Sequence, residues 1–129
     1  MRQSATRFSD IFCFVLVLAI WTIKPVPCLA KDAVVTRCGW IHNPTPANWW
    51  LIDKQATWKI SEQGESQPHG FDLIPDLSSD FVATNRGYGY ACACLSGEFS
   101  KPENRVIKIT HFVQRRISDC QGDRALPPP

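Results

Sequence analysis

The sequence has little net charge, no apolar run of membrane-spanning length and no internal repeat. Its 129 residues carry 14 basic and 12 acidic side chains, a formal charge of +2, whereas nucleic-acid-binding domains usually show a clear basic excess. The longest apolar run has 13 residues, and a bilayer-spanning helix needs about 20. These absences argue against a nucleic-acid binder and against a stable membrane span. The short length argues for one small domain, and 44% hydrophobic residues are too many for a disordered chain.

The sequence also lacks the spacings that mark common active sites. It has three histidines, His42, His69 and His111. They form no HExxH motif, and no serine stands in a nucleophile elbow. Three aspartates recur every four residues, at Asp72, Asp76 and Asp80, but Pro75 interrupts the helix that would align them. We therefore predict no catalytic residue, no metal ligand and no cofactor, and we favour a non-enzymatic protein.

The first thirty residues have the features of a secretory signal. Arg2 and Arg7 precede the apolar run at residues 11–23, whose length suits the central region of a signal. Prolines follow the run, and Cys28-Leu29-Ala30 supplies a cleavage site of the small-x-small type. We predict a cleaved signal over residues 1–30, with an uncleaved anchor or a lipid anchor at Cys28 as the alternative.

Cleavage after Ala30 would leave an electrically neutral chain of 99 residues. It removes three of the basic residues and one of the acidic residues, so that 11 of each remain. A neutral domain has no charge-driven affinity for nucleic acid or for an anionic membrane surface. We expect one domain over residues 31–126, followed by a disordered polyproline tail at 127–129.

Four cysteines remain after this cleavage: Cys38, Cys92, Cys94 and Cys120. An even number in a short exported chain predicts a disulfide framework. A bond between Cys92 and Cys94 would close a strained ring. Two pairings stay open, Cys38 with Cys92 and Cys94 with Cys120, or the crossed alternative. The rival interpretation is a Cys-based metal site, but Cys92 and Cys94 are separated by one residue, whereas zinc knuckles usually place about two to four between paired ligands.

Hydrophobic alternation predicts strands rather than helices over most of the remaining chain. Trp49–Ile52 is apolar and Ala56–Ser61 alternates, so the short polar link between them predicts a β-hairpin. The stretch at 43–48 contains two prolines and is expected to form a loop. One short helical turn is expected after Pro75. Together these patterns predict a mainly β fold, a small antiparallel barrel-like or sandwich domain of five or six strands held by two disulfides.

Two further predicted strands have faces that can be assigned from the alternation. In Tyr88–Leu95, one face carries Tyr88, Tyr90, Cys92 and Cys94, and the other carries Gly89, Ala91, Ala93 and Leu95. We expect a tryptophan ring to pack on the small residues of that second face. In the strand at 105–113, the alternation places Ile107, Ile109, His111 and Val113 together on one face.

The tryptophans supply the only candidate ligand site. Four of them lie within nineteen positions: Trp40, Trp49, Trp50 and Trp58. Such residues either fill a small core or stack on sugars and peptides. Because Trp49 and Trp50 are adjacent, a strand would point them to opposite sides, and at least one is expected to be partly exposed. We take Trp49 and Trp50 as the candidate ligand platform.

Three short sequence motifs occur together: CGW at 38–40, NPTPANWWL at 43–51 and GYGYACACL at 87–95. With these motifs and Cys120, the chain resembles domain of unknown function 4087, a family of small exported bacterial proteins, over about residues 37–126. The resemblance implies a bacterial source, a periplasmic or extracellular location and four cysteines that belong to the pattern. The family has no established activity, so no catalytic residue follows from it.

These observations together predict an exported binding or envelope-associated module without enzymatic activity. Its partner would be an unidentified envelope or extracellular component. A small secreted hydrolase and a Cys-based metal-binding protein are the alternatives.

Overall fold

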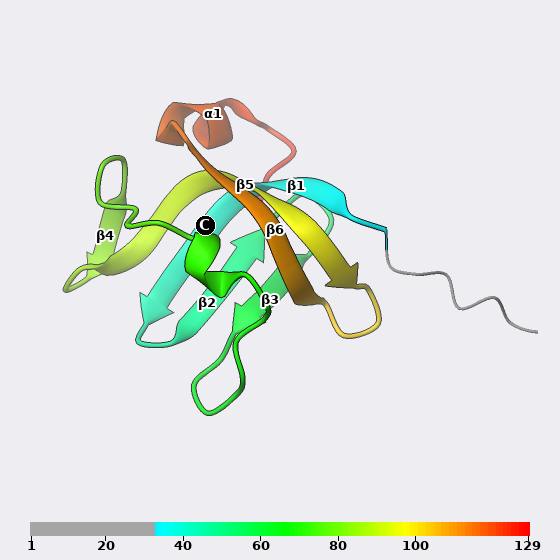
Figure 1. Ribbon diagram of the computed structural model, residues 1–129. Coiled ribbons are helices and arrows are strands. Elements are labelled where there is room, and N and C mark those ends of the chain that lie inside the picture. The colour runs from blue at the N-terminus through cyan, green and yellow to red at the C-terminus, as the bar shows by residue number, and fades with distance from the viewer. Residues whose placement is uncertain (1–32) are drawn as a thin grey trace, which may run out of the picture.

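The computed structural model describes residues 33–129, so the predicted signal at 1–30 lies outside the described residues. The elements in chain order are β1 (Val35–Thr45), β2 (Asn48–Ile52), β3 (Thr57–Ser61), η1 (Phe71–Leu73), β4 (Val82–Asn85), β5 (Tyr88–Ser100), β6 (Arg105–Arg115) and α1 (Ile117–Gly122) (Figure 1). The prediction of a mainly β fold is confirmed. Over these residues, no helix has the length and apolar character that a membrane crossing requires.

Five of the strands close into a ring. The sheet order is β1-β2-β3-β6-β5-β4, and β1 also pairs with β5. All pairings are antiparallel except the contact between β3 and β6, which has one registered parallel pair, Lys59 with Arg105. Strands β1 to β3 form a meander and β5 returns beside β1, which is a Greek-key connection. A five-stranded, partly open Greek-key barrel is the architecture of the OB fold. The barrel-like prediction is therefore confirmed, with one parallel contact added.

The predicted hairpin is confirmed as β2 and β3, but the predicted loop at 43–48 is shorter than expected. β1 continues through Thr45, and only Pro46 and Ala47 connect it to β2. The pairing of β1 with β5 ends at Asn43, one residue before Pro44. On the other side of β1, Pro44 lies where the β1–β2 register shifts, between His42 and Thr45. At such an irregular position the missing proline N–H removes no ladder hydrogen bond, so the strand tolerates it.

The two faces of β5 agree with the alternation. Ala91, Ala93 and Leu95 are completely buried in the core. The prediction that a tryptophan ring packs over the start of this face is wrong at Gly89. A side chain there would collide with the backbone carbonyl of Val82 in β4, so the close neighbour is a strand backbone. The missing Cβ allows β4 to approach β5.

The alternation predicted for β6 is wrong. Two register shifts opposite β5, between Ser96 and Gly97 and between Glu98 and Phe99, each insert an additional residue of β6. Each inserted residue reverses the direction of the side chains that follow. Beyond Arg105, the buried or half-buried residues of β6 are consequently Val106, Ile109, Phe112 and Gln114. His111, Ile107 and Val113 are exposed instead of sharing a face with Ile109.

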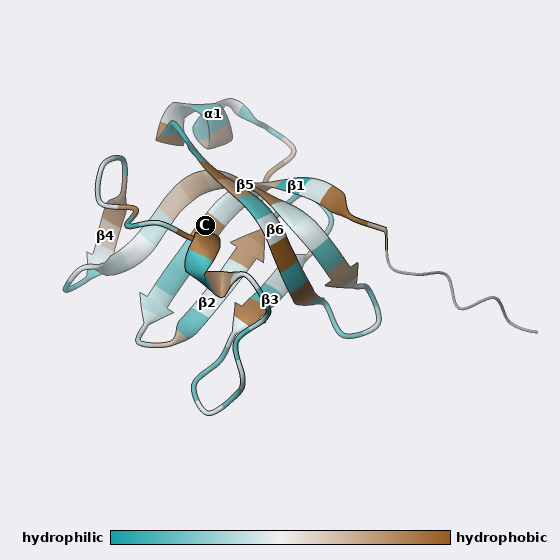
Figure 2. Cartoon of the chain, viewed as in Figure 1, coloured by the Kyte–Doolittle hydropathy of each residue, from teal (hydrophilic) through white to brown (hydrophobic). Residues whose placement is uncertain are grey.

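The helical segments are short. η1 lies before Pro75, whereas one turn was expected after it. Gly70 precedes η1 with φ 79° and Ile74 ends it in extended geometry, which the following proline favours. α1 was not predicted. The main core contains Ile41, Leu51, Trp58, Ile60, Leu95, Val106 and Ile109. Figure 2 shows apolar stretches along β2, β3 and β6 and hydrophilic connections at the β3–η1 and β5–β6 ends.

Candidate functional site

All four predicted cysteines form disulfides, in the crossed pairing, Cys38 with Cys94 and Cys92 with Cys120. Cys38 and Cys94 face each other across the β1–β5 pairing. Cys92 and Cys120 are buried and tie α1 to β5, packed with Trp40. Each of these four sulfur atoms is thus engaged in a disulfide, and within residues 33–129 no three His, Cys, Asp or Glu side chains gather as they would around a metal ion.

Trp49 and Trp50 lie on opposite sides of β2, and both are half-buried. Trp49 packs against the main core, with its ring 5.8 Å from that of Phe71 in an edge-to-face contact. Trp50 stands on the outer face of the barrel, where its ring lies 5.9 Å from that of His42. The structure therefore does not unite the pair into one platform, and each belongs to a different surface.

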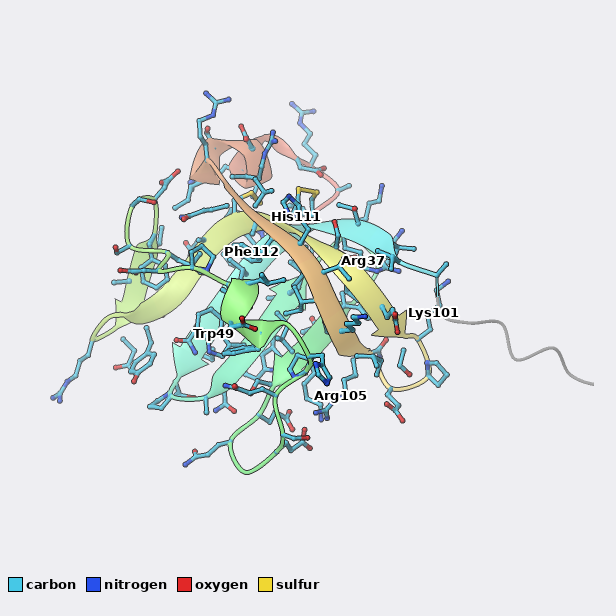
Figure 3. All side chains as sticks on the ribbon, viewed as in Figure 1. Arg37, Trp49, Lys101, Arg105, His111 and Phe112 are labelled. Carbon is cyan, nitrogen blue, oxygen red and sulfur yellow. A yellow bond between two sulfur atoms is a disulfide. The ribbon has the colours of Figure 1, made fainter. Side chains whose placement is uncertain are left out.

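Trp49 lines a hollow of about 280 Å³, which we call the Trp49 hollow. Its lining residues are Asn43, Trp49, Pro75, Asp76, Leu77, Ser78, Phe81 and Gly87. The segment 75–81 forms one wall and is held in place by hydrogen bonds from β6 and α1. The Gln114 side-chain amide donates to the carbonyls of Leu77 and Asp80, at 3.2 and 3.0 Å. The backbone N–H of Ile117 donates to the Asp80 carboxylate at 2.8 Å. The wall is thus anchored to β6 and α1. Figure 3 shows Trp49 beside η1.

The groups that the hollow offers to a ligand are mostly apolar. Trp49, Leu77 and Phe81 supply the apolar surface. The Asn43 amide is already used, because it donates to the carbonyls of Thr45 and Asn48. Asp76 is exposed and accepts one hydrogen bond, from the Ser78 N–H to Oδ1 at 3.0 Å. Its carboxylate is the only one in the lining. An aromatic wall with one carboxylate can hold a small ligand that has an apolar face and hydroxyl groups.

Trp50 belongs to a line of aromatic rings on the outer face of β2, β1 and β5, made by Trp50, His42 and Tyr90, which we call the outer row. The His42 ring lies 5.9 Å from Trp50 and 6.2 Å from Tyr90, both edge-to-face. All three side chains are half-buried. Burial lowers the pKa of His42, which favours its uncharged form at neutral pH. The outer row is therefore an uncharged, partly exposed aromatic strip.

A third group, which we call the inner cluster, was not predicted from the sequence. It consists of Arg37, Asp53, Trp58 and Phe99. The Arg37 guanidinium lies 4.0 Å from the Trp58 ring centroid and 5.0 Å from that of Phe99. Asp53 is 4% exposed and pairs with Arg37 at 2.9 Å. It also accepts the backbone N–H groups of Gln55 and Ala56 and the Trp58 indole N–H.

The cause of the Asp53 pKa shift is the balance between burial and these bonds. Burial alone would raise the pKa of Asp53, but the hydrogen bonds from Ala56, Gln55, Arg37 and Trp58 together lower it. The carboxylate therefore stays charged and orders the β2–β3 turn. The role of Asp53 could have been predicted from its position in the sequence. An aspartate at the start of a hairpin turn commonly accepts backbone N–H groups two or three residues later.

Comparison with curated proteins and with solved structures finds no match. Comparison with protein families finds one described as "Protein of unknown function (DUF4087)", over residues 32–127. That range includes all six strands, both disulfides and the residues of the Trp49 hollow, the outer row and the inner cluster. The chain therefore belongs to the DUF4087 family.

Proposed function

We propose that this protein is an exported, non-enzymatic binding module that holds its ligand in the Trp49 hollow. Two disulfides support export, because such bonds persist in oxidising compartments and are rare in the cytosol. The observation that carries the binding proposal is the construction of the hollow. An aromatic wall faces a segment that the Gln114 side chain of β6 and the backbone N–H of Ile117 in α1 hold in position. Such a site loses little conformational entropy when a ligand enters.

The ligand class that suits this lining is a sugar, as in a fragment of an envelope glycan. The apolar face of a sugar ring stacks on an indole, and its hydroxyl groups donate to a carboxylate such as Asp76. Hydrolysis of a glycosidic bond generally uses two carboxyl groups, and the lining contains one. This favours binding over the alternative of a hydrolase. OB-type barrels do include oligosaccharide binders, although a fold alone assigns no ligand.

The test is a titration of the intact protein with soluble peptidoglycan and glycan fragments, followed by tryptophan fluorescence. We expect a saturable change that Trp49→Ala removes and Trp50→Ala retains, because the two rings lie on different surfaces. Asp76→Asn provides a second variant, since Asp76 is exposed and its loss leaves the core intact. It should weaken binding about tenfold, which corresponds to one charge-assisted hydrogen bond. No change in fluorescence at millimolar ligand would contradict the proposal.

Export itself has a separate test. The mass of the protein recovered from the periplasm or the medium of an expressing bacterium should correspond to a chain that begins at residue 31. Recovery of the full-length chain from the cytosol would contradict export, whatever the outcome of the ligand titration.

A further inference from the structure

The C-terminal segment of the chain covers one end of the aromatic surface that the outer row belongs to. The Trp40 indole N–H donates to the carbonyl of Pro127 at 2.9 Å. Leu126 packs on the buried cluster of Trp40, Cys92 and Cys120, and Leu126 and Pro127 line a depression beside Ile52. Residues 126–129 read Leu-Pro-Pro-Pro. A proline-rich segment of this chain is thus bound, through a proline carbonyl, by a tryptophan on the outer face of the barrel.

The strand register shows that this covered position and the outer row are parts of one surface. Trp40 is registered with Ile52 on one side and Cys92 on the other, and His42 is registered with Trp50 and Tyr90. Residues two apart along a strand share a face, so the outer row is the next level along the same face. The rings of Trp40 and Tyr90 touch edge-to-face, with centroids 5.4 Å apart. The aromatic surface therefore continues past the end that the tail covers.

The chemistry of the uncovered part suits the same kind of segment. Proline-rich peptides bind as extended polyproline helices on grooves lined by aromatic residues, where indole N–H and tyrosine hydroxyl groups meet their carbonyls. Trp50 and Tyr90 supply both kinds of donor, and within residues 33–129 neither donates a side-chain hydrogen bond. From Tyr90 through His42 to Trp50 the ring centroids extend over at most about 12 Å. At roughly 3.1 Å per residue, that length matches about four residues of polyproline helix.

We propose that the outer row, together with Trp40, is a docking surface for a proline-rich extended segment of a partner protein, and that residues 126–129 occupy its Trp40 end. The site shares no residue with the Trp49 hollow. The two proposals therefore stand or fall separately.

The first experiment titrates the intact protein with a synthetic octaproline peptide and with a glycine-serine peptide of equal length, monitored by two-dimensional NMR. We expect saturable shifts with octaproline alone, centred on residues of β1, β2 and β5. Trp50→Ala and Tyr90→Ala should each weaken the affinity at least tenfold, and Trp49→Ala should leave it unchanged. Because Trp50 and Tyr90 are half-buried at the surface, both variants are expected to fold. Affinity that is equal in wild type, Trp50→Ala and Tyr90→Ala would overturn the proposal.

A second experiment uses a variant that ends at Leu126. Removing residues 127–129 frees the Trp40 indole N–H, so octaproline should bind several-fold more tightly than to the intact protein. Unchanged or weaker binding would overturn the claim that tail and partner share one surface. Failure of octaproline to bind either form would overturn the proposal as a whole. Concentration-dependent self-association that the truncation abolishes would assign the surface to the tail of a second copy and also overturn the partner proposal.

Discussion

The inner cluster and the outer row use similar residues on the same barrel, and they differ in what covers their rings. Trp58 is 2% exposed, with a guanidinium stacked on its face and its indole N–H bonded to Asp53 at 3.0 Å. Trp50 and Tyr90 each contact the ring of His42 edge-to-face, and all three side chains are only half-buried. The first arrangement leaves a ligand no ring face and satisfies the indole N–H. The second leaves ring surface and hydrogen-bond donors available.

This difference indicates that the role of an aromatic residue in this barrel depends on how much of its ring other residues bury. A buried tryptophan contributes area and packing to stability, and a half-exposed one contributes less stability and a contact surface. Trp40 lies between these cases, because the C-terminal segment and the Cys92–Cys120 disulfide cover it. If this comparison is right, substitutions in the inner cluster should mainly change the free energy of unfolding, and substitutions in the outer row should mainly change binding.

The largest effect is expected from Trp58→Ala. The substitution removes a fully buried ring that contacts Phe99 and Arg37, leaving a cavity and an Asp53 carboxylate without one of its donors. Large-to-small changes of this kind cost about 3–5 kcal/mol, which is a large share of the stability of a small domain. Urea unfolding followed by circular dichroism measures it. A loss below about 1 kcal/mol would contradict the assignment of Trp58 to the stabilising cluster.

The second prediction removes the cover of Trp40 through the double variant Cys92→Ala/Cys120→Ala. The sequence separation of 28 gives a loss of about 3.5 kcal/mol in the free energy of unfolding by the chain-entropy model. Hydrogen exchange should also rise in α1 and the segment after it, because the disulfide ties them to β5. The matched control is Cys38→Ala/Cys94→Ala, since β1 and β5 keep nine registered pairs. That control should lose a similar free energy without faster exchange confined to α1. Equal exchange in α1 in both variants would contradict this prediction.

The third prediction concerns the charge of the inner cluster. Asp53→Asn removes the negative charge that four hydrogen-bond donors now bond, and it can also point an amide N–H₂ at those donors. The substitution should lower the free energy of unfolding by about 2–3 kcal/mol near neutral pH. Hydrogen bonds hold the folded pKa of Asp53 below the unfolded value of 3.8. The corresponding stability is therefore fully present above that value and is lost as pH falls through the folded pKa. Urea midpoints measured from pH 6 down to pH 2 should decline less steeply in Asp53→Asn than in wild type. Parallel curves would show that Asp53 contributes nothing to the acid response.

Strands β2, β3, β5 and β6, the β2–β3 hairpin and the faces of β5 were predictable, because each follows from the local hydrophobic pattern, whereas β1 and β4 were not predicted. The faces of β6 were not, because two bulges depend on the partner strand β5 and leave no mark in the hydrophobic pattern. The crossed disulfide pairing depends on the register of β1 against β5, which is a long-range property. For the candidate site, adjacency alone placed Trp49 and Trp50 on opposite sides. The tail over Trp40 and the wall at 75–81 arise from contacts between residues more than thirty positions apart, which single-sequence patterns do not reveal.

The smallest effect on stability is expected from Trp50→Ala, which tests the other side of the comparison. The ring is half-exposed, and its aromatic contact is an edge-to-face one with His42, so the loss should be below about 1 kcal/mol. The same change should remove most of the binding of octaproline. Unfolding curves and peptide titrations on one preparation give both values, and Trp58→Phe serves as the matched control, because it should lower stability and leave the peptide affinity unchanged. A Trp50→Ala variant as unstable as Trp58→Ala would show that the outer row is part of the core. In that case the division between a stabilising and a recognising aromatic surface would be wrong, even if the peptide no longer bound.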